Sequence, residues 1–217
     1  PAVLTWSIVP DGTMAPGISG QSTAASDLRS FLGGIYGTNP GEPTQNKPWF
    51  SVLESAFDDM GQTCGVEFVF EESDDGIPIS TSADGVLGTR GDIRLAARAL
   101  DGSNETLAFA YAPGYGDLVI DSSDSFFNST GSSSIRMHNV VAHELGHAMG
   151  LSHVCPINRT KLMEPLISQD FRGARFDEFQ SLQRQYGDPL EHHSDEREND
   201  SPVDATPLIL PVDDTLS

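Results

Sequence analysis

The chain has 217 residues and a formal net charge of −20 at pH 7, from 12 Lys and Arg against 32 Asp and Glu. This excess of negative charge would repel nucleic-acid phosphates and anionic lipids, which argues against both as partners. With 37% hydrophobic residues the chain can bury a core, whereas its apolar runs are too short to span a membrane and two cysteines are too few for a disulfide-rich miniprotein.

Strand and helix patterns alternate through residues 1–187, which predicts a mixed α and β domain. Strands are expected at residues 4–8, 66–70, 92–99, 107–111 and 118–120, where apolar residues alternate or cluster. Helices are expected at residues 26–35, 48–60, 134–149 and 176–186, the last three followed by glycine. Residues 188–217 hold nine acidic residues, one basic residue, four prolines and no aromatic residue, so we expect a disordered tail or linker there.

Residues 143–153 read HELGHAMGLSH and carry most of the chemical information. Two histidines four positions apart on a helix face the same side, so His143 and His147 can bind one Zn²⁺. Gly150 lets the chain leave the helix, and His153 can return as a third ligand. Three protein ligands leave one position open for water, which is typical of catalytic zinc. Glu144 could then take a proton from the attacking water and return it to the leaving amine.

Chance histidines on a helix are the alternative, and the joint spacing of Gly150 and His153 argues against it. With that spacing the segment resembles the metzincin motif HExxHxxGxxH. Metzincins also have a methionine-containing turn below the zinc, and Leu162-Met163-Glu164-Pro165 resembles its matrixin form. Pro165 stands where astacins and serralysins carry a tyrosine, so the resemblance favours the matrixin-like branch for residues 1–187.

The resemblance implies an α+β, zincin-like fold, with a twisted, mostly parallel five-stranded sheet, an active-site helix and a C-terminal helix. It implies that Met163 supports the zinc ligands without binding the metal. Leu107 and Ala108 would belong to the edge strand that pairs with a peptide substrate, and residues 166–176 would line a specificity pocket. Asp177 and Glu178 open the last helix, where the helix dipole explains them; binding of a matured N-terminus is the alternative that the family implies.

Metal sites beyond the catalytic zinc are also implied by the resemblance. Calcium-ligand positions of matrixins are matched at one site by Asp101, Gly102, Asp121 and Asp124, and at a second site by Asp92 and Asp117. Hard oxygen ligands suit Ca²⁺, but aspartates in loops also cap helices and make turns, so both readings stay open. Matrixins bind a structural zinc through three His and one Asp, and two of the positions that would supply His are Phe109 and Val119. We therefore expect one zinc and one or two calcium ions.

Cys64 and Cys155 could form a disulfide that pins the zinc loop, or they could be two thiols. We favour the disulfide because the protein resembles an extracellular protease.

The resulting hypothesis is a secreted, monomeric zinc endopeptidase that acts on polypeptides. Two alternatives from other classes remain. One is a zinc- and calcium-binding peptide or matrix-binding module with little turnover, against which the intact Glu144 argues. The other is a calcium-stabilised adhesion module in which the His cluster binds a structural zinc, and such a zinc usually has a fourth protein ligand.

Overall fold

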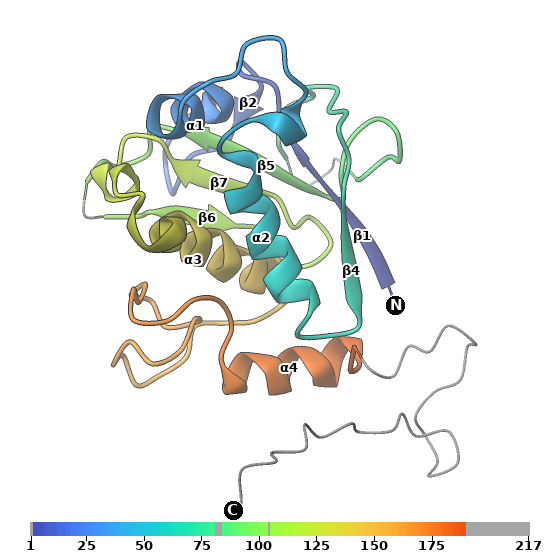
Figure 1. The fold of residues 1–217 in the computed structure, drawn as a ribbon, viewed down its shortest axis with the longest axis vertical. Coiled ribbons are helices and arrows are strands. Elements are labelled where there is room, and N and C mark those ends of the chain that lie inside the picture. The colour runs from blue at the N-terminus through green and yellow to red at the C-terminus, as the bar shows by residue number, and fades with distance from the viewer. Residues whose placement is uncertain (1, 81–83, 104, 190–217) are drawn as a thin grey trace, which may run out of the picture.

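A computed structural model describes residues 2–80, 84–103 and 105–189 and is built around one five-stranded sheet (Figure 1). The strand order is β4-β1-β5-β7-β6. The strands are β1 (Ala2–Ile8), β4 (Val66–Phe70), β5 (Ile93–Arg98), β6 (Ala108–Ala110) and β7 (Leu118–Asp121). All neighbouring strands are parallel except β6, which pairs with β7 in antiparallel fashion at one edge. The mostly parallel, five-stranded sheet is thus confirmed. Of the predicted tail, residues 190–217 lie outside the described residues.

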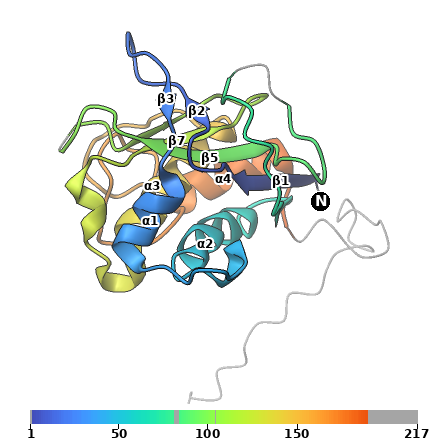
Figure 2. The ribbon, with the colours of Figure 1, turned by 90° about the horizontal axis from the view of Figure 1, so that it is seen from above.

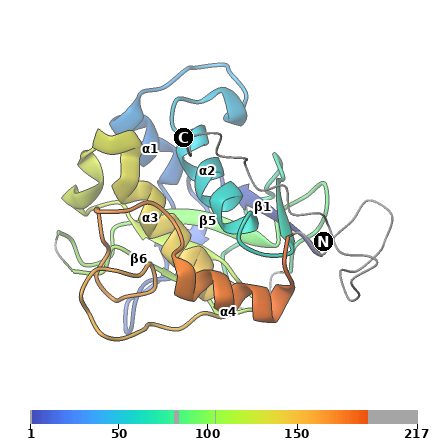
Figure 3. The same cartoon turned by 60° about the horizontal axis from the view of Figure 1, so that its bottom comes forward.

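Within the described residues, four helices accompany the sheet, as the sequence predicts. They are α1 (Leu28–Tyr36), α2 (Phe50–Gly61), α3 (Gly131–Ala148) and α4 (Phe176–Tyr186), with short 3₁₀ turns η1 (Thr44–Asn46) and η2 (Ser125–Asn128). Helices α1, α2 and α3 lie on one side of the sheet (Figure 2), and α4 closes the bottom of the molecule (Figure 3). Residues 132–134 have left-handed backbone angles, so the regular part of α3 begins near the predicted start. No helix within the described ranges is long and apolar enough to cross a bilayer.

The main core forms where α2 packs on β1. Helix α2 carries Phe50, Leu53 and Phe57 at helical spacing, and all three side chains are buried. Trp6 of β1 stacks on the ring of Phe57 at 4.3 Å between centroids. Burying side chains of this size stabilises the fold by about 1.5–3 kcal/mol each. This packing fixes the sheet against α2, and α2 in turn packs along α3.

A second, smaller apolar cluster covers the opposite face of the sheet. It contains Val9, Ala15, Ile79, Ala96 and Val119, with Phe109 packed against it. Ala15 comes from a hairpin of β2 (Met14–Ala15) and β3 (Ala24–Ala25), which the sequence analysis did not predict because two-residue strands carry no periodic signal. Phe109 and Val119, at the positions that would supply histidines to a structural zinc, therefore pack in an apolar environment.

The predicted disulfide between Cys64 and Cys155 is wrong, because both residues are free cysteines. Cys64 is buried in the core just after α2, where burial raises the pKa of its thiol. Cys155 is exposed in the loop that follows His153. One sulfur therefore lies inside the core and the other faces solvent.

Candidate active site

Three histidines meet at the C-terminal end of α3. His143 and His147 lie on one face of this helix, and Gly150, with a φ of 93°, turns the chain so that His153 comes back toward them. Nε2 of His153 lies 3.1 Å from Nε2 of His143 and 3.1 Å from Nε2 of His147. Among the described residues, this triad is the only group of three or more His, Cys, Asp or Glu whose ligand atoms converge closely enough for a metal ion.

Backbone carbonyls set the protonation of two of these rings. Nδ1 of His143 lies 2.7 Å from the carbonyl oxygen of Leu162, and Nδ1 of His147 lies 2.8 Å from that of Leu151. A carbonyl only accepts hydrogen bonds, so both Nδ1 atoms carry a proton, which leaves Nε2 of each ring as the atom that can bind a metal. Burial and the neighbouring imidazoles lower the pKa of His143 to about 4, which keeps the ring neutral. Three converging imidazole nitrogens fit Zn²⁺.

Glu144 places a carboxylate beside the triad. It is only 6% exposed, and its Oε2 atom has no hydrogen-bond partner among the described residues. Burial raises the pKa of Glu144 to about 8. A buried carboxyl group with one oxygen that lacks a partner among the described residues, next to three converging imidazole nitrogens, is suited to proton transfer.

A cleft of about 440 Å³ opens over the triad. Its lining includes Ala108 and Ala110 of β6, the loop residues Gly150–His153, and the side chains of Glu144 and His147. Since β6 is the last strand of the sheet, its outer edge is free to pair with an extended peptide. The structure thus places Ala108 at the cleft, whereas Leu107 lies outside its lining and accepts a hydrogen bond from the N–H of Asp121.

The turn that contains Met163 lies directly below the ligand helix. Leu162 and Met163 are buried, and a Cβ atom added to Gly146 would lie 2.5 Å from Sδ of Met163. The backbone N–H of Met163 donates to Oε1 of Glu178 at 3.2 Å, so α4 holds the turn in place. The helix-dipole explanation of Glu178 missed this contact, because nothing in the local sequence indicates a partner 15 residues away.

Glu164 organises the loop between His153 and Met163, a role the sequence analysis also missed. Its buried carboxylate accepts hydrogen bonds from four consecutive backbone N–H groups, at 2.5–3.0 Å, those of Asn158, Arg159, Thr160 and Lys161. Burial alone would raise the pKa of Glu164, but these four hydrogen bonds outweigh it and lower the pKa to about 2. A carboxylate directly after the methionine of such a turn is the signal that could have indicated this role.

The first group of calcium candidates makes local turn contacts. The Asp121 carboxylate accepts hydrogen bonds from the N–H groups of Leu100, Gly102 and Ser123. Asp101 accepts from the N–H and hydroxyl of Thr106, and Asp124 accepts from the N–H of Phe126 at the start of η2. These contacts belong to the turn and capping alternative, and calcium binding here stays a prediction.

Asp92 and Asp117, the second pair of calcium candidates, differ from each other in how many of their carboxylate oxygens accept a hydrogen bond. Asp92 accepts hydrogen bonds from the N–H and hydroxyl of Thr5 through Oδ2, at 2.7 and 2.8 Å. Asp117 accepts from the N–H of Arg94 through Oδ1, but its buried Oδ2 has no hydrogen-bond partner among the described residues. Burial raises the pKa of Asp117 to about 7. A proton or a cation would satisfy this oxygen.

Comparisons with known proteins identify relatives of this chain. The model of the matrixin family of peptidases matches residues 40–187. The chain is 36% identical over 94 residues to stromelysin-2 of Rattus norvegicus, which covers 40% of this chain and 19% of that protein. It is 36% identical over 98 residues to stromelysin-1 of Rattus norvegicus, which covers 42% of this chain and 20% of that protein. It is 37% identical over 75 residues to matrix metalloproteinase-21 of Xenopus laevis, which covers 34% of this chain and 12% of that protein.

The chain thus spans a fifth or less of the length of these relatives. The family match, in contrast, covers well over half of the chain, including α3, the histidine triad and α4. The expected α+β fold of this family is confirmed, and the family implies zinc at the triad. The chain belongs to the matrixin family.

Proposed function

We propose that this protein is a secreted zinc endopeptidase that hydrolyses internal peptide bonds of polypeptides. The observation that carries the proposal is the convergence of the three Nε2 atoms beside the buried carboxyl group of Glu144, within one cleft. Secretion rests on the extracellular character of the family, and the protein acts as a monomer. The match to the matrixin family model includes the residues of this site, which supports the same chemistry here.

His143, His147 and His153 would hold the zinc ion. When bound, zinc supplies a Lewis acid that polarises the scissile carbonyl and acidifies a water molecule. Oε2 of Glu144, which has no hydrogen-bond partner among the described residues, takes the proton from the attacking water and passes it to the leaving amine. The free edge of β6 at Ala108 binds the substrate backbone as an added strand, which aligns the scissile bond with the triad. Met163 supports the ligand helix from below.

Calcium binding is a further part of the proposal. Asp117 supports it best, because its buried Oδ2 has no hydrogen-bond partner in the part of the chain that the structure describes, and a hard cation would satisfy that oxygen. Asp92 belongs to the same proposed site, and Asp101, Gly102, Asp121 and Asp124 belong to the other. The test is thermal unfolding with and without added Ca²⁺. The unfolding temperature should rise with Ca²⁺ in the wild type and rise less in Asp117→Asn; equal rises would count against this ligand.

The deciding experiment compares the wild type with Glu144→Gln, a variant of nearly the same shape. Both proteins should bind one zinc ion, and only the wild type should cleave a quenched peptide library, with turnover reduced about 10²–10⁴-fold in the variant. Zinc binding without turnover in either protein would favour the binding-module alternative. A folded wild type without affinity for zinc would overturn the proposal.

A further inference from the structure

The chain segment formed by residues 168–173 is tied to α3 by one buried side chain. Asn139, only 1% exposed, donates from Nδ2 to the carbonyl oxygens of Ser168 and Phe171, at 3.0 and 2.7 Å. Its Oδ1 accepts from the N–H of Gly173 at 2.9 Å. One amide thus satisfies three backbone groups of a segment that has no regular secondary structure.

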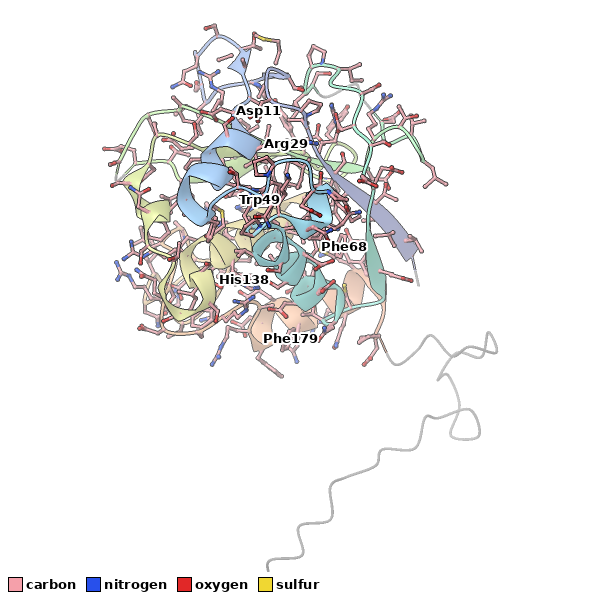
Figure 4. All side chains as sticks on the ribbon, turned by 45° about the horizontal axis from the view of Figure 1, so that its top comes forward. Asp11, Arg29, Trp49, Phe68, His138 and Phe179 are labelled. Atoms are coloured by element: carbon pink, nitrogen blue, oxygen red, sulfur yellow. The ribbon has the colours of Figure 1, made fainter. Side chains whose placement is uncertain are left out.

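A second layer of contacts fixes the orientation of this amide. His138, labelled in Figure 4 where α2 and α3 meet, is fully buried and places Nδ1 3.1 Å from Oδ1 of Asn139. Nε2 of His138 lies 2.8 Å from Oδ2 of Asp59 on α2. Arg172, from the tied segment, donates to the same Asp59 oxygen at 3.3 Å and to the hydroxyl of Ser55 at 2.6 Å. Helices α2 and α3 therefore both hold residues 168–173 in place.

The position of Asn139 on α3 connects this anchor to the candidate active site. Asn139 lies four residues before His143, so both side chains project from the same side of the helix. Hydrogen bonds attach the chain after His153 to α3 on both sides of residues 163–167. On one side Leu162 bonds to His143, and on the other side residues 168–173 bond to Asn139. Two exposed contacts add to the second side, from Arg136 to the side chain of Gln169 and from Arg172 to the carbonyl oxygen of Ser133. Between these attachments lie residues 163–167, in which Leu166 is 50% exposed.

Residues 163–167 lie across α3 from the substrate-binding strand. Figure 1 shows β6 above α3, and below α3 the orange chain that leads to α4. A peptide paired with β6 would run over the triad, and its side chains on the side away from β6 would face residues 163–167. The distance between α3 and these residues then decides which side chains fit, and both attachments set that distance.

We propose that Asn139 is a positioning residue for substrate selection: by holding residues 168–173 on α3, it fixes the wall that selects one substrate side chain. The inference rests on the proposed function and extends it to a residue that touches neither metal nor substrate. Loss of the amide leaves three backbone groups unpaired inside the protein, so the segment shifts until they find water or new partners. A shifted wall discriminates less between large and small side chains.

Three variants test the proposal. Asn139→Leu has a similar volume and removes all three hydrogen bonds, whereas Asn139→Asp keeps the bond from Gly173 and places an oxygen against two carbonyls. Val140→Ala is the matched control, because Val140 is the adjacent buried residue of α3 and belongs to the main core rather than to this anchor. The measurements are zinc content, hydrogen exchange of residues 164–173, and kcat/KM for peptides varied at one position at a time around the scissile bond.

Both Asn139 variants should keep one zinc ion per chain and exchange faster at residues 164–173. The ratio of kcat/KM between the best and the worst side chain should fall about tenfold at one substrate position and change less than about twofold elsewhere. Val140→Ala should leave both the kcat/KM ratio and the hydrogen exchange of residues 164–173 unchanged.

The inference would be overturned if the Asn139 variants showed unchanged hydrogen exchange, unchanged selectivity, or an equal loss of kcat/KM for all peptides. If Asn139→Leu does not fold, Asn139→Asp decides by the same criteria. A zinc-bound wild type that cleaves no peptide overturns the proposed function, and the selectivity role with it.

Discussion

The guanidinium of Arg94 donates two hydrogen bonds to the carboxylate of Asp74, at 2.6 and 2.9 Å, and both side chains are fully buried. Arg94 belongs to β5 and Asp74 to the loop between β4 and β5. Burial opposes ionisation of Asp74, but the hydrogen bonds from Arg94 and Ser7 lower the pKa of its carboxyl group. The pair therefore ties this loop to the sheet, next to the apolar cluster that contains Ile79.

Removing one partner of this pair should destabilise the protein strongly. Asp74→Leu leaves the guanidinium buried without its counter-ion, so the free energy of unfolding in urea should fall by about 3–5 kcal/mol. The double variant Asp74→Leu with Arg94→Met should recover much of that loss, because apolar side chains can replace a buried ion pair. Lys161→Met is the control, since the Lys161–Asp177 pair is partly exposed and spans 3.7 Å, and it should cost less than about 1 kcal/mol. If Asp74→Leu lowered the free energy of unfolding by less than about 1 kcal/mol as well, the Asp74–Arg94 pair would not hold the loop on the sheet.

Glu164 should make the fold sensitive to acid. Its pKa in the folded protein is about 2, below the value of 4.5 in an unfolded chain, so its contribution to stability is complete above pH 4.5 and is lost as the pH falls toward 2. Glu164→Gln should therefore lower the free energy of unfolding at pH 6 and weaken its decrease between pH 4.5 and pH 2. Urea unfolding of metal-free wild type and variant over this range gives the difference without interference from zinc. Parallel pH profiles for the two proteins would show that Glu164 is not held by the loop.

Gly146 should not accept a methyl group. An added Cβ would meet Sδ of Met163 at 2.5 Å, and Met163 is buried, so Gly146→Ala must displace the methionine turn or the ligand helix. We expect a loss of about 1–3 kcal/mol in stability, together with weaker zinc binding measured by competition with a chelator. Gly34→Ala is the matched control, because Gly34 lies in α1 with open space around it and alanine favours the helix there. Equal zinc affinity in both variants would exclude a supporting role for Met163.

The two cysteines should differ in reactivity. In the native protein an alkylating reagent should add to the exposed Cys155 and spare the buried Cys64, and after unfolding without a reductant it should add to both. Mass spectrometry of the intact chain counts the added groups. No addition after unfolding would show a disulfide and would contradict the structure.

The sequence alone determined the features that depend on local spacing. The positions of α1 to α4 and of the five strands follow from apolar periodicity, proline and glycine, because each of these signals lies within one element. The meeting of the three histidines beside Glu144 follows in the same way, since residues four apart on a helix share a face and Gly150 permits the return of His153. The edge position of β6 came from the family resemblance.

Only the tertiary structure decided which distant residues meet. Asp74 and Arg94, Met163 and Glu178, and Asn139 and the 168–173 segment are 15 to 34 residues apart and have no local pattern in common. The same holds for Cys64 and Cys155, because their positions in the sequence do not show whether the two sulfur atoms lie close enough to form a disulfide. A buried polar group must find a partner somewhere, and the packing of the whole chain, rather than any stretch of it, determines which partner lies within reach.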